Sequence, residues 1–246
     1  MNIFFEIHRD IPREGPGNNE STRKAYQLIG KYVSQPVILD IGSGPGMQTI
    51  ELAGITDGSI LAADLNEDFL KVLAERAEKQ GFSKKIDPQK ADMCNLPFEE
   101  EKFDVIWSEG AIYIIGFEKG LKEWKRFVKQ DGIVAVTEFT WLKDNAPKEA
   151  RDFWDEAYPG AGTIDSNVQV AESLGYRLID SFVLPESAWW KDYYTPLEDR
   201  LSLLREKYKD HEDALKVIDD TQQEIDLYRN YHEYYGYVFY LFQKVD

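Results

Sequence analysis

Three glycines alternate with other residues directly after an apolar run, and an aspartate precedes them. Residues 36–41 read Pro-Val-Ile-Leu-Asp-Ile and lead into Gly42, Gly44 and Gly46. Glycine lets a backbone turn sharply and approach a ligand closely. A dinucleotide-binding loop instead has the spacing Gly-x-Gly-x-x-Gly and places a pyrophosphate on the helix that follows. Because the third glycine comes one position early, and because Asp40 would repel a pyrophosphate, the loop favours a ligand that carries positive charge.

Two further aspartates follow predicted strands. Asp64 ends the apolar run 60–63, and Asp92 follows a weaker strand over 86–90. An acidic residue at the tip of the second strand can accept hydrogen bonds from both ribose hydroxyls, although Asp64 could instead cap the next helix. The carboxyl ends of parallel strands meet at one edge of a sheet. Asp40, Asp64 and Asp92 are therefore expected to line one edge of the sheet.

The hydrophobic pattern predicts the elements that position these residues. Along 36–140, short β-branched runs alternate with amphipathic helical stretches, which indicates βαβ units and half of a doubly wound parallel sheet. The predicted strands cover 36–41, 60–63, 86–90, 103–107, 133–137, 176–184 and 236–242. Helices are predicted over 23–33, 47–53, 117–129, 147–158 and 168–174, with a long helical region at 185–234. Ser21 or Asn19 is expected to cap the first of these. A further helix is expected to begin after the cap Asn66 and to end at Gly81.

At these residues the chain resembles a known family. Residues 40–46 are similar to the first motif of class I S-adenosylmethionine-dependent methyltransferases, whose acidic, glycine-rich loop curls under the amino-acid part of the cofactor. The sulfonium and ammonium groups of that cofactor account for the carboxylate. Asp64 and the segment 91–93 match the family's ribose-binding and adenine-reading positions. The resemblance covers residues 30–142 and is greatest to the small-molecule branch that includes ubiquinone and menaquinone biosynthesis enzymes.

The resemblance implies an α/β, Rossmann-like, doubly wound sheet of seven strands, with the last strand antiparallel and a helical insertion between the last two strands. The sequence has no internal repeat, low-complexity linker or break in composition, so a single domain over 1–246 is expected. Its expected parts are an N-terminal lid and helix (1–33), a cofactor-binding core (34–142), helices with a sixth strand (143–184), the helical insertion or lid (185–234) and the last strand (235–246). The cofactor-binding residues implied are Asp40, Gly42, Ser43, Gly44, Gly46, Met47, Asp64, Leu65, Asp92, Met93, Ser108, Glu109 and Gly110.

The residues that meet the methyl acceptor are less clearly indicated. Family insertions tend to lie over the substrate, so aromatic residues of the insertion could line an apolar pocket, or they could form ordinary core. The candidates for that pocket are Tyr113, Trp189, Trp190, Tyr193 and Tyr194. Candidates for a catalytic base are Glu109, Tyr113 and His232, with Glu138 competing by position, whereas His8 and His211 are expected to be solvated. In-line methyl transfer can proceed by alignment and desolvation alone, so no base is assigned.

The composition excludes some classes of binding partner. The 29 basic and 45 acidic residues give a net charge of −16, which disfavours nucleic acid and anionic membranes. The start of the chain does not have the pattern of a signal peptide, and the single cysteine gives no indication of disulfide bonds, so the predicted location is the cytoplasm. That cysteine, Cys94, is expected to fill space beside the adenine. No metal site is expected, since Glu138 and Asp144 are too sparse a match to one.

The predicted function is S-adenosylmethionine-dependent methyl transfer to a small molecule. The main alternative is a non-catalytic sensor of S-adenosylmethionine or S-adenosylhomocysteine. A nicotinamide-dependent oxidoreductase is disfavoured by the glycine spacing and by Asp40.

Overall fold

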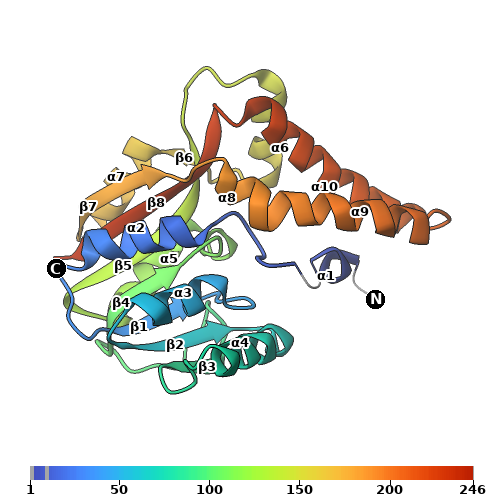
Figure 1. Ribbon diagram of the computed structural model, residues 1–246. Coiled ribbons are helices and arrows are strands. Elements are labelled where there is room, and N and C mark those ends of the chain that lie inside the picture. Colours follow the sequence, from blue (N-terminus) through green and yellow to red (C-terminus); the bar gives the residue numbers. More distant parts are fainter. Residues whose placement is uncertain (1–2, 9–10, 246) are drawn as a thin grey trace.

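The computed structural model describes residues 3–8 and 11–245 and has an α/β architecture built on one mixed sheet (Figure 1). The strand order is β3-β2-β1-β4-β5-β8-β7, and β6 pairs with β5. The strands are β1 (Val37–Ile41), β2 (Ser59–Asp64), β3 (Ile86–Lys90), β4 (Phe103–Ser108), β5 (Val128–Trp141), β6 (Gly162–Thr163), β7 (Tyr176–Val183) and β8 (Tyr235–Lys244). β8 runs antiparallel to both of its neighbours. The predicted doubly wound sheet with an antiparallel last strand is confirmed, and the two-residue β6 is an addition.

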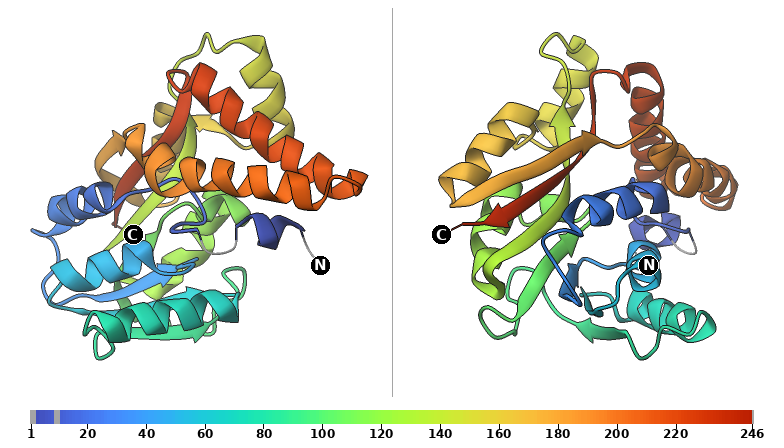
Figure 2. Two further views of the ribbon diagram at one scale, coloured as in Figure 1. Left: turned by 45° about the vertical axis from the view of Figure 1, so that its right-hand side comes forward. Right: turned by 60° about the vertical axis from the view of Figure 1, so that its left-hand side comes forward.

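Helices cover both faces of the sheet (Figures 1 and 2). The helices are α1 (Ile3–Ile7), α2 (Asn19–Ile29), α3 (Met47–Ile55), α4 (Glu67–Lys79), η1 (Ile112–Ile114), α5 (Phe117–Trp124), η2 (Lys125–Phe127), α6 (Lys148–Ala157), α7 (Ile164–Ser173), α8 (Ser187–Trp189), the π-helix η3 (Trp190–Tyr194), α9 (Thr195–Lys207) and α10 (Glu212–Tyr231). One core joins α2, α3 and the α8–α10 insertion to the sheet. The other core joins α5 and α7 to the opposite face.

Several predicted boundaries differ from the observed ones. The helix expected over 117–129 ends at Trp124, because β5 already begins at Val128. Asp131 and Gly132, which separate the predicted helix 117–129 from the predicted strand 133–137 and have the composition of a turn, lie instead at an irregularity inside β5, where Asp131 has a φ of 62°. The helix expected over 23–33 is α2, four residues earlier. None of the helices in the described ranges is long and apolar enough to cross a membrane. Residues 1, 2, 9 and 10 of the predicted lid and residue 246 of the predicted last strand lie outside the described residues.

The N-cap of α2 is Asn18 rather than Ser21 or Asn19. Asn18 is extended, and its side-chain oxygen accepts a hydrogen bond from the Ser21 amide at 2.7 Å. An Asn18→Ala variant is expected to lose about 1 kcal/mol of unfolding free energy, because the first turn of α2 loses its side-chain acceptor. Urea denaturation measures this loss. Asn95→Ala removes an exposed asparagine and serves as the control. Equal stability losses in both variants would contradict the capping role.

Candidate active site

The glycine loop between β1 and α3 lies against two other segments. Gly42, Gly44 and Gly46 all have positive φ values, of 70°, 54° and 86°. A Cβ on Gly42 would lie 2.5 Å from the Cβ of Ala111, and a Cβ on Gly46 would lie 2.2 Å from Leu73 Cδ1. Only glycine fits both positions, because the backbone conformation and the space exclude a side chain. A Cβ on Gly44 would meet only the Glu14 side chain, at 3.6 Å.

Asp40 is a fully buried carboxyl group beneath this loop. Its Oδ2 atom accepts a hydrogen bond from the Thr49 hydroxyl at 2.5 Å and a longer one from Gln48 at 3.4 Å. Its Oδ1 atom is buried and has no hydrogen-bond partner in the described part of the chain, and the same is true of the Ser43 hydroxyl. Burial raises the pKa of Asp40 to about 7, and the Thr49 hydrogen bond counteracts this in part. An unpartnered buried carboxylate oxygen suits a cationic hydrogen-bond donor.

Asp64 ties the end of β2 to the glycine loop. Its Oδ2 atom accepts from the Gly44 amide and its Oδ1 atom from the Asn66 amide, both at 2.8 Å. The cap of α4 is Asn66, so Asp64 does not have the alternative capping role. Burial raises the pKa of Asp64. Each carboxylate oxygen has a second lone pair, which leaves both oxygens able to accept further hydrogen bonds. The next residue, Leu65, is 62% exposed.

The third predicted strand end is more open. Asp92 is exposed, and its Oδ1 atom accepts from the amide of Cys94, which is exposed as well. Met93 lies beside the glycine loop, because its Cε atom is 3.5 Å from the Cβ position of Gly42. The structure therefore brings Met93 to the loop and leaves the Asp92 carboxylate at the surface in a local turn.

Glu109 is the centre of a buried polar network. Its Oε2 atom is 3.2 Å from Nη1 of Arg13, in an ion pair whose two side chains are only 4% and 2% exposed. Its Oε1 atom accepts from the Thr22 hydroxyl at 2.7 Å and from the Trp107 indole at 2.9 Å. These contacts tie residues 11–18, here called the N-terminal strap, to the end of β4. Glu109 has its hydrogen bonds satisfied within the protein, which favours a positioning role.

The strap also contacts the glycine loop and the insertion. The Gly17 amide donates to the carbonyl of Ala188 at 2.8 Å. Glu14 lies next to Gly44, and burial together with the Asp64 carboxylate raises the pKa of Glu14 to about 8, whereas Arg76 lowers it. The sequence predicts this segment as part of an N-terminal lid but does not single out Arg13 or Glu14, because neither belongs to a motif and both reach the site only through tertiary contacts.

The remaining residues predicted to bind the cofactor are Ser108, Gly110 and Met47. Ser108 is buried and donates to the carbonyl of Ile41 at 2.9 Å, and the Gly110 amide donates to the Thr137 hydroxyl at 2.7 Å. Met47 is the half-buried first residue of α3. These contacts hold the end of β1, the end of β4 and Thr137 of β5 in place relative to one another.

The aromatic residues of the insertion divide into two groups. Trp189 and Tyr194 are 1% and 0% exposed, and the Trp189 ring stacks on Tyr228 at 4.1 Å, as ordinary core residues do. Tyr193 is 9% exposed and stacks on Tyr194 at 5.1 Å, and Trp190 is half-buried. The core interpretation therefore describes Trp189, Tyr193 and Tyr194, and Trp190 packs against that core.

The structure places the candidate base His232 near the surface and buries His8. His232 lies 3.1 Å from Glu186 and is 38% exposed, at the end of α10. His8 was expected to be solvated, but it is 5% exposed, with its ring 6.3 Å from the Tyr193 ring. That expectation is wrong because α1 packs against α9 and α10.

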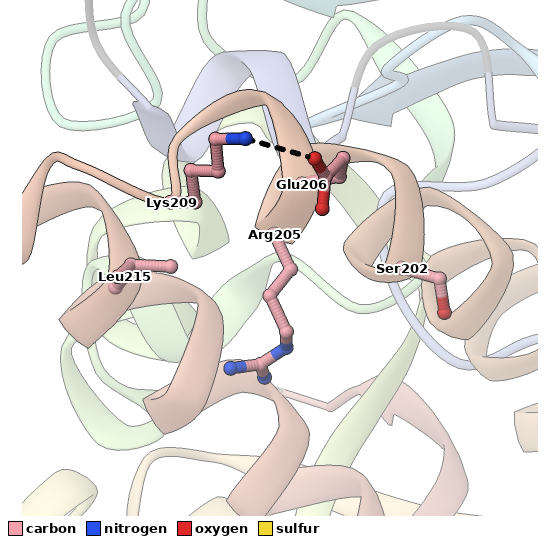
Figure 3. Close-up of a pocket in the computed structure, with 5 residues that line it drawn as sticks. All are labelled: Ser202, Arg205, Glu206, Lys209 and Leu215. Carbon is pink, nitrogen blue, oxygen red and sulfur yellow. Dashed lines mark hydrogen bonds and ion pairs between the residues drawn. The ribbon is translucent and has the colours of Figure 1, made fainter.

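The described residues have a surface hollow away from this edge but no cluster that could hold a metal ion. A surface hollow at α9 and α10 is lined by Ser202, Arg205, Glu206, Lys209 and Leu215 (Figure 3). None of these residues comes from a strand end, so the hollow has no place in a nucleoside site. The described ranges bring together no group of three His, Cys, Asp or Glu side chains that could hold a metal.

Comparisons with known proteins agree with this geometry. A family profile described as a methyltransferase domain matches residues 38–132. Over 58% of its length the chain is 27% identical to a sterol 24-C-methyltransferase of Gibberella zeae, and over 56% it is 30% identical to a ubiquinone/menaquinone biosynthesis C-methyltransferase of Azotobacter vinelandii. The matched regions span 40% and 58% of those two relatives.

The fold also has close structural counterparts. A methyltransferase from Geobacter sulfurreducens, solved in complex with S-adenosylhomocysteine, aligns with a TM-score of 0.82 over 98% of this chain and 97% of its own, at 18% identity. The profile covers the glycine loop and the ends of β1, β2 and β4, which are the elements that assemble the site described above. The comparisons therefore support the class I S-adenosylmethionine-dependent methyltransferase family, through a methyltransferase-domain profile that covers residues 38–132.

Proposed function

We propose that the protein binds S-adenosylmethionine at the edge formed by β1, β2 and β4 and transfers its methyl group to a small-molecule acceptor. The observation that carries this proposal is the pairing of the glycine loop with Asp40, whose Oδ1 atom is buried and lacks a partner in the described part of the chain. The cofactor's ammonium group provides a cationic donor for this part of the site. Asp64 holds the ribose hydroxyls, and Met93 contacts the adenine.

The protein's contribution to the reaction is positioning and the exclusion of water. When bound, the cofactor supplies a methyl group on a positively charged sulfur. The loop fixes the methionine part against Ala111 and α4, and the strap covers it from the side of Glu14. Aligning donor and acceptor in a site closed to water supplies much of the rate of an in-line transfer.

Two measurements test this function. Isothermal titration calorimetry should show binding of S-adenosylmethionine and S-adenosylhomocysteine and none of NAD. Formation of S-adenosylhomocysteine on addition of amines, phenols or thiols then distinguishes an enzyme from a sensor. Binding of NAD alone would refute the cofactor assignment, whereas cofactor binding without turnover across the panel would favour the sensor.

The affinity for S-adenosylmethionine is expected to rise about tenfold between pH 6 and pH 8. Burial raises the pKa of Asp40 to about 7, so the carboxyl is largely protonated at pH 6 and ionised at pH 8, and only the ionised form attracts a cation. Calorimetry at pH 6, 7 and 8 measures the slope. Asp40→Asn should flatten it, and Asp210→Asn, at an exposed position, should leave it unchanged. An undiminished slope in Asp40→Asn would show that another group controls it.

A further inference from the structure

A second buried carboxyl group lies near the same edge and has no role so far. Ser108, the last residue of β4, pairs with Val136, so Glu138 lies two residues beyond the end of β4. Glu138 is 1% exposed, and neither of its carboxylate oxygens has a hydrogen-bond partner in the described ranges. The Tyr158 hydroxyl lies close enough to lower the pKa of Glu138, yet it does not form a hydrogen bond of normal geometry with either oxygen. A buried carboxylate with so little support is costly unless a ligand, an ion or water provides donors.

Tyrosines surround this carboxyl. The Tyr158 hydroxyl lies beside Glu138, and the Tyr158 ring packs edge-on against Tyr113 at 6.2 Å. Tyr113 belongs to η1, directly after Ala111, the residue that contacts the glycine loop at Gly42. Glu138 and its tyrosines are therefore connected through η1 to the loop that would hold the methyl donor.

The charged groups around Tyr113 are acidic. Tyr113 is 43% exposed, yet its partial burial raises its pKa, and the carboxylates of Glu224, Glu138 and Glu14 raise that pKa further. Glu224 accepts a hydrogen bond from Tyr194 at 2.8 Å. The π-helix η3 places Tyr193 and Tyr194 here, and π-helical segments often mark functional sites.

Two basic side chains of the described residues lie close to this group of carboxylates and tyrosines. The His8 ring lies 6.3 Å from Tyr193, and Arg76 acts on Glu14. Carboxylates among aromatic rings attract cations through charge and through the ring faces, and they repel anions. A carboxylate or phosphate acceptor is thus disfavoured beside Tyr113.

We propose that the methyl acceptor is a primary or secondary amine, bound at Glu138 with Tyr113 and Tyr158. This inference rests on the proposed methyl transfer. The amine binds as its ammonium ion and gives one proton to the Glu138 carboxylate. The freed nitrogen lone pair forms the new N–C bond while the C–S bond breaks, and that bond's electron pair goes to sulfur. The product is a methylated ammonium ion, and the proton leaves Glu138 for solvent.

The raised pKa of Glu138 suits this transfer of a proton from the bound ammonium ion. Burial raises its pKa to about 8, and the Tyr158 hydroxyl counteracts this in part. The carboxyl is therefore mostly protonated at pH 7 without a ligand. A bound ammonium ion favours the ionised form, so amine binding should release a proton from Glu138.

Binding to the protein saturated with S-adenosylhomocysteine tests the proposal. Two matched series are titrated by calorimetry at pH 7: butylamine, butanol and butyrate, then phenethylamine, phenethyl alcohol and 3-phenylpropionate. In at least one series the amine should bind about tenfold more tightly than the alcohol or the acid. Repeating the titration in buffers of different ionisation enthalpy should show proton release. Glu138→Gln should abolish that release and weaken amine binding about tenfold, and Glu118→Gln, an exposed glutamate of α5, should change neither.

Turnover with S-adenosylmethionine and the better amine completes the test. Glu138→Gln should lower kcat and leave the affinity for S-adenosylmethionine unchanged. The amine proposal is overturned if the cofactor binds but the amines bind no better than the acids, or if Glu138→Gln behaves as wild type. If S-adenosylmethionine itself does not bind the wild-type protein, it is the proposed methyl transfer that fails.

Discussion

An Asp64→Ala variant is expected to bind S-adenosylmethionine about 100-fold more weakly than the wild-type protein. A hydrogen bond to a charged group contributes about 1.5 kcal/mol or more, and the ribose offers two hydroxyl donors to one carboxylate. The carboxylate also holds the Gly44 amide at 2.8 Å, so its removal loosens the loop under the cofactor. Calorimetry measures the affinity, and far-ultraviolet circular dichroism checks that the variant folds.

Cofactor analogues separate the ribose contact from the effect on the loop. S-adenosylhomocysteine and its 2′-deoxy form are each titrated into wild type and Asp64→Ala. The missing hydroxyl should weaken binding to wild type about tenfold and make little difference to Asp64→Ala. Asp210→Ala, at an exposed position, should match wild type throughout. Equal losses from the missing hydroxyl in both proteins would assign Asp64 to the loop alone.

The parts of this edge that the sequence predicts are those governed by local rules. A fully buried strand, alternating glycines and a helix start form one continuous stretch, so β1, the loop and α3 follow from residues 36–53. β3 was predicted with its observed bounds, Ile86–Lys90, although Pro88 weakens the pattern. The cap Asn66 was also found, because its side chain acts on an amide two residues away.

The parts that escaped prediction depend on contacts between distant segments. Arg13 and Glu109 are 96 positions apart, and no pattern in either segment indicates the other. Tyr158 reaches Glu138 only after β5 has extended past the end of β4 and α6 has folded back. The Asp131-Gly132 pair has the composition of a turn, but sheet pairing on both sides of it keeps the chain in β5. Tertiary pairing overrides local preference at such positions.

The Arg13→Met variant is expected to lose about 3 kcal/mol of unfolding free energy. The substitution keeps most of the buried volume but removes the cation from the Glu109 carboxylate, which is 2% exposed. Hydrogen bonds from Thr22 and Trp107 remain, yet neither neutralises the charge. Urea denaturation measures the loss. Arg23→Met breaks the ion pair between Glu51 and Arg23, whose side chain is 47% exposed, and should change stability little.

The double variant Arg13→Met with Glu109→Gln determines whether the lost stability comes from an uncompensated charge. Glutamine still accepts the Thr22 and Trp107 hydrogen bonds and carries no charge, so the double variant should be more stable than Arg13→Met alone. If it is no more stable, the loss reflects packing of the strap instead. Affinity for S-adenosylmethionine should follow the same order as stability, because the ion pair holds Glu14 and the rest of the strap against the glycine loop.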